Sequence, residues 1–174
     1  MPKPNKVRLV PHDRDWAHKG AQEGERLRAA ASALIFVHHI GSTAIPGIAA
    51  KPVIDLLAVA SDLDELDRQS QNIEALGYSS HGEYGLAGRR YFKLDDPDTG
   101  ARLLQLHAYA DGDPSITRHL AFRDHLRAHP DIAAAYDAEK RRCAALHPGN
   151  SHAYSDCKGD WIARVEAEAL AARD

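Results

Sequence analysis

Hydrophobic residues along the chain follow two different spacings, and each spacing predicts one kind of element. Short runs rich in β-branched and aromatic residues, closed by Gly, Pro or Asp, are typical of strands. Longer segments with apolar residues three and four positions apart are typical of helices. The predicted strands are 34–40, 53–59, 89–94 and 101–109. Helices are predicted from about residue 16 up to the first of these strands, and over 61–76, 115–128, 130–146 and 151–172.

The first helix and the segment before it have mixed signals. Residues 7–10 (VRLV) form a short strand or an extended arm, and Asp13 or Asp15 can cap the helix that follows. Gly20 and Gly24 lie inside this helix and weaken the prediction, because glycine disfavours helical backbone.

The second central strand and the helix after it have clearer boundaries. Pro52 takes the first position of the strand over 53–59, where a missing N–H is tolerated. Ser61 with Asp64 three residues later resembles a capping box at the start of the next helix. Gly77 marks the end of that helix.

The order of these elements predicts the fold class. The polar, glycine-rich stretch 78–88 is a loop or a weak strand, and DDPDTG at 95–100 is a turn that joins two strands into a hairpin. The chain therefore reads as a helix, two strands, a helix, a hairpin and three helices. This is an α+β pattern: a mixed sheet with helices packed on it and a helical C-terminal third. The length suits one domain over 1–174.

Composition and charge exclude several function classes. Hydrophobic residues make up 44% of the chain and charged residues 27%, which is ordinary for a globular protein. The net charge of −3 argues against general binding to nucleic acid or to an anionic membrane. No apolar run approaches membrane-spanning length, and the N-terminal residues lack the hydrophobic stretch of a signal peptide. We therefore expect a cytoplasmic protein with no membrane partner.

Two cysteines, Cys143 and Cys157, lie in segments predicted to be helical. No CxxC pair is present, so a structural zinc site is not expected. The simplest interpretation is a pair of reduced thiols.

Asp55 is the first candidate for chemistry, because it lies inside an otherwise apolar strand. Side chains alternate along a strand, so Asp55 shares a face with Leu57 and Val59. An ionised carboxylate there is costly unless a metal, a basic side chain or a helix end is its partner. Taken alone, Asp55 is best explained as a structural ion pair.

Gly41 and Ser42 change this view. Glycine lets the chain turn sharply and lets backbone N–H groups approach an anion. Gly41, Ser42, Thr43 and Lys51 could together hold a phosphate, with Asp55 placing a divalent cation beside it. The alternative is a turn that needs glycine only for its geometry and serine only as a cap. Spacing alone favours neither.

The hairpin adds further candidates. Gln105 and His107 share one strand face, which is unusual for a face that covers an ordinary core. Arg89 and Arg90 are suited to phosphate, but adjacent residues point opposite ways, so only one can serve a given site. His107 could be a metal ligand, a general base or a structural histidine.

Four more residues could line the same cleft. His39 lies two residues before Gly41 and is favoured over its neighbour His38. His119, Arg123 and Lys158 lie on the predicted C-terminal helices, and for each of them a plain surface role is an equal alternative.

Known nucleotide and metal motifs do not decide the matter. The chain has no Walker loop, no GxGxxG and no HExxH. His125 and His129 are one helical turn apart without an acid or a third ligand, so we interpret them as solvated.

Several stretches nevertheless resemble the GrpB family of bacterial proteins. They span nearly the whole chain: VRLVPHDRDW, HHIGSTAIPGIAAKPVIDLL, EALGY, GRRYFK, HLAFRDHLRAHPDIAAAY and HAYSDCKGDWI. The resemblance implies a sheet of the nucleotidyltransferase type. Family members also occur fused to dephospho-CoA kinase, which implies a link to nucleotide or coenzyme A metabolism.

The implied fold assigns roles to particular residues. Ser42 matches the serine of the nucleotidyltransferase turn, and Asp55 matches the first of its metal-binding acids. Leu57 stands in the place of the second acid, and Gln105 or His107 in the place of the third. Transfer with two metal ions needs several hard oxygen ligands. Asp55 and His107 could hold at most one divalent ion.

Three functions remain at this point. The favoured one is binding of a nucleotide or another phosphorylated small molecule, by a monomer or a homodimer. The others are a metal-dependent nucleotidyltransferase with a rearranged site and a non-catalytic interaction module.

Overall fold

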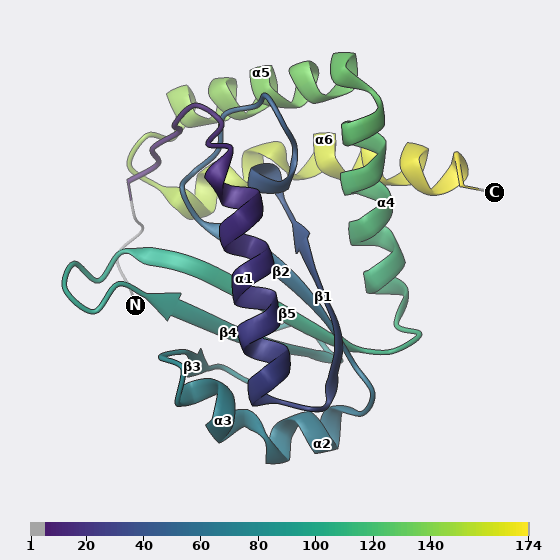
Figure 1. Cartoon of the computed structure of the whole chain (residues 1–174). Helices are drawn as coiled ribbons and strands as arrows, with labels where there is room; N and C mark the ends of the chain where they lie inside the picture. The colour runs from purple at the N-terminus through teal and green to yellow at the C-terminus, as the bar shows by residue number, and fades with distance from the viewer. Residues whose placement is uncertain (1–5, 174) are drawn as a thin grey trace.

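The computed structural model describes residues 6–173, which fold as an α+β structure around one mixed sheet (Figure 1). The predicted order of elements is confirmed. The elements are α1 (Asp15–Ala30), β1 (Leu34–Ile40), the 3-10 turn η1 (Ser42–Ala44), β2 (Ile54–Ala60), α2 (Leu63–Arg68), α3 (Ser70–Glu74), β3 (Ser79–Ser80), β4 (Arg89–Asp95), β5 (Arg102–Ala110), α4 (Pro114–Ala128), α5 (Pro130–Leu146) and α6 (Ser151–Ala171).

The sheet has five strands in the order β1-β2-β5-β4-β3. β1 and β2 are antiparallel, β2 and β5 are parallel, and β5 and β4 form the predicted antiparallel hairpin. β2 and β5 are therefore the central neighbours. Asp55 pairs with Gln105 in the register between them, so both side chains lie on the same face of the sheet.

The two faces of the sheet have different compositions. One face is apolar and packs against α1, α2 and α3. Its buried residues on the central strands are Leu56, Ala58, Ala60, Leu104, Leu106 and Ala108. The opposite face carries Asp55, Gln105 and His107 toward one end. The pairing of β2 with β5 thus gathers the polar residues of two strands into one place.

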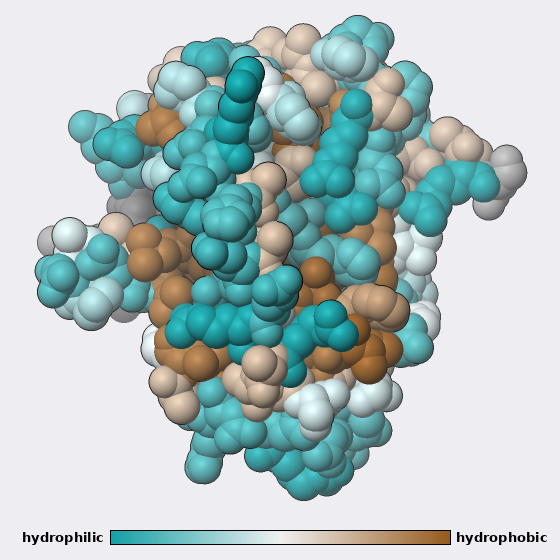
Figure 2. Space-filling view, in the orientation of Figure 1, coloured by the Kyte–Doolittle hydropathy of each residue, from teal (hydrophilic) through white to brown (hydrophobic). Residues whose placement is uncertain are grey.

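Helix α1 lies close against the sheet because of its glycines. Its buried residues are Trp16, Gly20, Gly24 and Leu27, spaced to form one face of the helix. A Cβ on Gly20 would lie 3.2 Å from the ring of His39. The absence of a side chain on Gly20 therefore lets β1 pack closely against α1. Seen from this side, hydrophilic side chains cover the helix and hydrophobic ones show beside it (Figure 2).

The last three helices lie together (Figure 1), and Ile116 and Leu120 of α4 pack on the face of the sheet that carries Leu57. Ile45 and Ile48, from the segment after η1, are buried in the core that these helices form. Two residues of α5 hold the same segment at Ala49. Its N–H donates to Oδ1 of Asp137 at 2.8 Å, and its carbonyl oxygen accepts a hydrogen bond from Nζ of Lys140. The helical third therefore fixes the chain between η1 and β2.

Several predicted boundaries shift. Residues 7–10 form only an isolated bridge, between Val10 and Ala50. The strand expected from Pro52 begins two residues later, at Ile54. Asp15 begins α1, and its N–H donates to Oδ1 of Asp13, one of the two expected caps.

The helix expected over 61–76 is instead two short helices capped by a different residue. Asp62, not Ser61, accepts a hydrogen bond from the N–H of Glu65 and caps α2. The break between the helices lies at Gln69. The side-chain Nε2 of Gln69 donates to Oγ of Ser32, and its side-chain Oε1 accepts a hydrogen bond from the N–H of Ala33. Both distances are 2.9 Å. This tertiary contact replaces a continuous helix.

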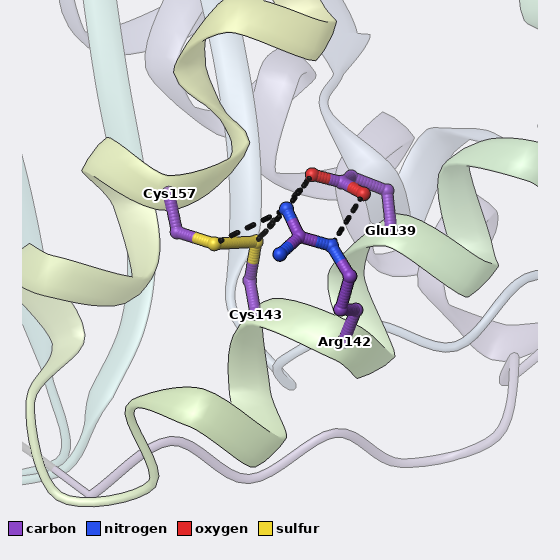
Figure 3. The surroundings of a disulfide bond; sticks show 4 residues. All are labelled: Glu139, Arg142, Cys143 and Cys157. Atoms are coloured by element: carbon purple, nitrogen blue, oxygen red, sulfur yellow. Dashed lines mark hydrogen bonds and ion pairs between the residues drawn. A yellow bond between two sulfur atoms is a disulfide. The ribbon is translucent and has the colours of Figure 1, made fainter.

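The prediction of two reduced cysteines is wrong for this structure. Cys143 on α5 and Cys157 on α6 form a disulfide, with their Cα atoms 5.8 Å apart (Figure 3). The guanidinium of Arg142 lies beside both sulfur atoms and is paired with Glu139 (Figure 3). Packing of α5 against α6 brings the two cysteines together, and sequence spacing alone does not show that packing.

No helix among residues 6–173 is both long and apolar enough to cross a membrane.

Candidate functional site

The turn after β1 is built around Gly41. Its φ of 75° lies in the left-handed region, which favours glycine. A Cβ at this position would lie 2.8 Å from Oδ2 of Asp55, closer than real Cβ contacts. Glycine is therefore needed for the backbone and for the approach of Asp55. The chain then enters η1, whose first N–H groups have no partner inside the turn.

A cavity of about 210 Å³ opens beside this turn. It is bounded by η1, β2, β5, α6 and the segment before β2. The lining residues are Ser42, Thr43, Ala50, Lys51, Val53, Asp55, Gln105, Tyr154, Ser155 and Lys158. Six residues selected from the sequence therefore come together here: Ser42, Thr43, Lys51, Asp55, Gln105 and Lys158.

Lys51 and Lys158 place two ammonium groups on this cavity. Both flank the buried ring of Tyr154, with Nζ 5.4 Å and 4.6 Å from its centroid respectively. Neither lysine forms an ion pair within 4.0 Å among residues 6–173. Positive charge without a direct carboxylate partner suits an anionic ligand.

Burial and mutual repulsion act on these lysines. Burial lowers the pKa of Lys51, and the charge of Lys158 lowers it further, while Asp55 opposes both effects. Burial also lowers the pKa of Lys158, and Asp55 again opposes the shift. An added anion would stabilise the protonated form of both side chains.

Asp55 and His107 face each other on neighbouring strands. Nε2 of His107 lies 3.5 Å from Oδ1 of Asp55, a long contact for a hydrogen bond. Asp55 is the more exposed of the two, at 31% for its side chain against 16% for His107. Tyr91 donates a hydrogen bond to Oε1 of Gln105 at 3.0 Å and completes this polar row.

This donor set fits one cation at most. Asp55 offers a hard carboxylate and His107 an imidazole nitrogen, while Leu57 is fully buried where a second acid would be needed. Among the described residues, the one cluster of three His, Cys, Asp or Glu ligands is Glu139, Cys143 and Cys157, and its sulfur atoms are in the disulfide.

Ser42 is held by the C-terminal helices. Its hydroxyl donates to the hydroxyl of Tyr136 on α5 at 3.4 Å. Burial raises the pKa of Tyr136 to about 12, so its phenol stays neutral. The ring of Tyr136 stacks on Trp161 of α6 at 5.0 Å. The turn is thus attached to α5 and, through Tyr136, to α6.

Neither arginine of the hairpin lines this cavity. Arg89 shares the sheet face of the site, but its guanidinium donates to the carbonyl oxygens of Glu83 and Tyr84 at 3.2 and 2.8 Å. Arg90 lies on the opposite face and pairs with Asp67 at 2.6 Å. The structure thus assigns both guanidinium groups to contacts within the protein.

The three other cleft candidates lie around the cavity, and none of them lines it. Nε2 of His39 is 2.8 Å from Oγ1 of Thr43, so His39 supports η1 from the α1 side of the sheet. The ring of His119 lies 6.3 Å from that of His107, and burial lowers its pKa to about 4. Arg123 donates to the carbonyl oxygen of His39 at 3.2 Å.

Tyr154, Ser155 and Tyr136 were not selected from the sequence. Tyr154 lies four residues before Lys158, and this spacing puts the two on one face of a helix, so that signal was present. No sequence signal connects Tyr136 with Ser42, because they are 94 residues apart and meet only through packing.

Comparison with known proteins assigns the family. The model of the GrpB protein family matches residues 6–168. The chain belongs to the GrpB family. It is 41% identical over 165 residues to the UPF0157 protein YqkA of Bacillus subtilis, covering 94% of this chain but 47% of that protein. The chain thus spans about half the length of that relative. A Streptomyces coelicolor relative, UPF0157 protein SCO7215, is 32% identical over 99% of this chain and 89% of its own length.

Solved structures confirm the fold. The GrpB protein of Enterococcus faecalis superposes with a TM-score of 0.88 at 34% identity, over 95% of this chain and 99% of that one. The Cid1 poly(U) polymerase superposes with a TM-score of 0.53 at 13% identity, over 79% of this chain and 43% of Cid1. The GrpB chain therefore has a nucleotidyltransferase-like fold.

Proposed function

We propose that this GrpB protein binds a nucleotide or another phosphorylated small molecule, with phosphate groups in the cavity between η1 and α6. The observation that carries the proposal is the pair of ammonium groups, Lys51 and Lys158, which face the cavity without an ion pair. Ser42 and Thr43 of η1 add polar side chains to the lining of the same cavity.

The charge balance of the cavity favours this ligand class. Two lysines and one aspartate give an excess positive charge at neutral pH when both lysines are protonated. A phosphate group has several acceptor oxygens and can take hydrogen bonds from both ammonium groups at once. Because the pKa of each lysine is lowered in the free protein, phosphate binding should take up protons and weaken at alkaline pH.

A single divalent cation is compatible with the same site. Asp55 and His107 would hold it, and phosphate oxygens or water would fill the remaining positions. When bound, such an ion would supply further charge neutralisation for phosphate. The chain itself supplies one carboxylate to this site, and its charge favours the protonated form of both lysines.

Metal-dependent nucleotidyl transfer is the second candidate, because the fold is shared with Cid1 and Asp55 occupies the strand next to the turn. Buried Leu57 in place of a second acid makes simple binding the better-supported function. A non-catalytic interaction module is the third, and the open cavity argues against it.

Calorimetry with the whole chain tests the proposal. The ligands are ATP, CTP and dephospho-CoA, with and without Mg²⁺. Dephospho-CoA is included because a dephospho-CoA kinase of Mycolicibacterium paratuberculosis is 33% identical over 90% of this chain. We expect a Kd of roughly micromolar to millimolar for at least one ligand.

Lysine variants locate the binding. Lys158→Met should weaken binding at least about tenfold, and Lys51→Met likewise, because each removes one charge from the cavity. Lys19→Met on the outer side of α1, where Lys19 pairs with Asp15, is the matched control and should bind normally. The absence of heat and of a thermal shift with every ligand would refute the proposal.

A further inference from the structure

A larger groove adjoins the phosphate cavity on the side of β4 and β5. Its volume of about 810 Å³ is in the range of small-molecule sites. It shares Lys51, Val53, Gln105 and Ser155 with the cavity. The cavity and the groove are therefore adjacent, and Lys51 lines both of them.

Two tyrosines form a stacked pair in this groove. The rings of Tyr84 and Tyr91 are 4.9 Å apart and nearly parallel, with 10° between their planes. Tyr91 is buried and fixed by its hydrogen bond to Gln105. Tyr84 is 55% exposed. A fixed inner ring supporting an exposed outer ring is a surface on which another flat ring can stack.

The backbone holds Tyr84 in a conformation that tyrosine seldom adopts. Its φ is 49°, and within residues 6–173 it is the one residue other than glycine with a positive φ. The buried guanidinium of Arg89 holds this loop through the carbonyl oxygens of Glu83 and Tyr84. Glu83 in turn accepts a hydrogen bond from the N–H of Gly88 at 2.6 Å. Strain that is held by its surroundings in this way is typical of ligand-contacting segments.

The charged residues that line the groove are basic, and one of them, Arg102, also pairs with Asp95 outside the lining. Nζ of Lys93 lies 5.6 Å from the centroid of Tyr84. Arg102, at the other side of the pair, donates to the hydroxyl of Tyr91 at 3.4 Å. Lys6 and Arg8 line the same groove. Aromatic rings combined with basic side chains suit a ligand that is both flat and anionic.

We propose that this groove binds the base of a nucleotide, stacked on Tyr84, while Lys51 and Lys158 hold its phosphates. The inference rests on the proposed function and narrows its ligand class to nucleoside phosphates. Arg89 is then a positioning residue that presents Tyr84, rather than a phosphate ligand.

The test compares ligands that share phosphate but differ in the base. ATP and CTP are titrated against pyrophosphate and ribose 5-phosphate, with the whole chain, by calorimetry. Tyr84→Ala should weaken nucleotide binding about ten- to a hundredfold, the size of a lost stacking contact, and leave pyrophosphate binding unchanged. Tyr84→Phe keeps the ring and should bind like the native chain.

Two further measurements separate stacking from an indirect effect. Leu86→Ala, at a 50% exposed residue of the same loop, is the control and should leave all affinities unchanged. Base protons of the bound nucleotide should shift upfield in the NMR spectrum through the ring current of Tyr84, and this shift should disappear in Tyr84→Ala.

The outcomes distinguish this inference from the proposed function. If pyrophosphate binds as tightly as ATP and CTP, or if Tyr84→Ala weakens both ligand classes equally, the groove does not bind a base and the phosphate site still stands. If no phosphate compound binds, both fail together.

Discussion

Gly41 and Asp55 fit each other at a distance that allows no side chain between them. A Cβ on Gly41 would lie 2.8 Å from Oδ2 and 3.2 Å from Cβ of Asp55. Gly41 directly follows β1, and Asp55 lies on the adjacent antiparallel strand β2, opposite Ile40 in the register. The glycine turn and the isolated acid, 14 positions apart in the sequence, are thus one structural unit.

Replacing Gly41 by alanine should destabilise the fold and displace Asp55. The backbone at φ 75° costs an alanine about 1–2 kcal/mol, and the contact with the carboxylate adds to this. We expect a loss of about 2–3 kcal/mol in the free energy of unfolding, measured in urea. In an Asp55→Ala background, Gly41→Ala should lower the free energy of unfolding by less, because the carboxylate that the new Cβ contacts is absent. An equal cost in both backgrounds would contradict this pairing.

Asp55→Asn should separate the two roles of the carboxylate. The charge of Asp55 opposes the lowering of the pKa of Lys51 and Lys158, and it would repel the proposed phosphate ligand. Without metal at pH 7, we expect phosphate binding to stay equal or to tighten a few-fold, because a negative charge leaves the cavity. Any gain in affinity from Mg²⁺ should disappear.

Asp160→Asn, at an exposed residue on α6, is the control for this experiment. It should keep both the affinity and the effect of Mg²⁺. If Asp55→Asn responds to Mg²⁺ like the native chain, Asp55 is not a cation ligand.

The elements that sequence predicted well are those with local signals. The strand 34–40 and the helix 130–146 agree with β1 and α5 in both bounds, because Gly41 and Pro130 interrupt the pattern where the elements change. The polar face of β5 was also predictable, since alternation along one strand puts Gln105 and His107 together.

The errors concern contacts between distant elements. One of Arg89 and Arg90 was expected to hold phosphate because arginine suits phosphate, but Arg89 donates to a loop whose path no local pattern predicts and Arg90 pairs with Asp67. The disulfide of Cys143 with Cys157 depends on how α5 packs against α6. Tertiary packing decides such pairings, so residue type and spacing alone do not.

Buried Lys140 should make stability depend on pH. Burial lowers its pKa from 10.5 to about 7, and the residue is 1% exposed. Between these values the unfolded chain binds a proton that the folded chain does not. The free energy of unfolding therefore rises with pH from about 7 to 10, by an amount on the order of 2–4 kcal/mol from this residue.

Lys140→Met tests this dependence. The variant loses the hydrogen bond to Ala49 but also the buried charge, so its rise in stability between pH 7 and 10 should be smaller than in the native chain. Lys19→Met, at an exposed lysine, should keep the native slope. If the free energy of unfolding in urea rises equally with pH in the native chain and in Lys140→Met, Lys140 is protonated to the same extent in the folded and unfolded chain.

The disulfide should stabilise the chain by linking α5 to α6. The two cysteines are 14 positions apart, and a cross-link closing a loop of this length contributes about 3 kcal/mol by restricting the unfolded chain. Double replacement by alanine, or addition of dithiothreitol, should lower the free energy of unfolding by about 2–3 kcal/mol. Denatured protein without reductant should take up no alkylating agent, as measured by mass.

Because Cys157 precedes Lys158 on α6, loss of the disulfide should also affect the cavity beside η1. The ring of Tyr154 touches both this region and the cavity, and it belongs to the small core that contains Cys143. We expect a measurable decrease in phosphate affinity in the Cys143→Ala/Cys157→Ala variant, smaller than that of Lys158→Met. Two alkylated thiols in the unreduced native protein would contradict the cross-link, and native stability of the alanine variant would contradict its role in holding α6.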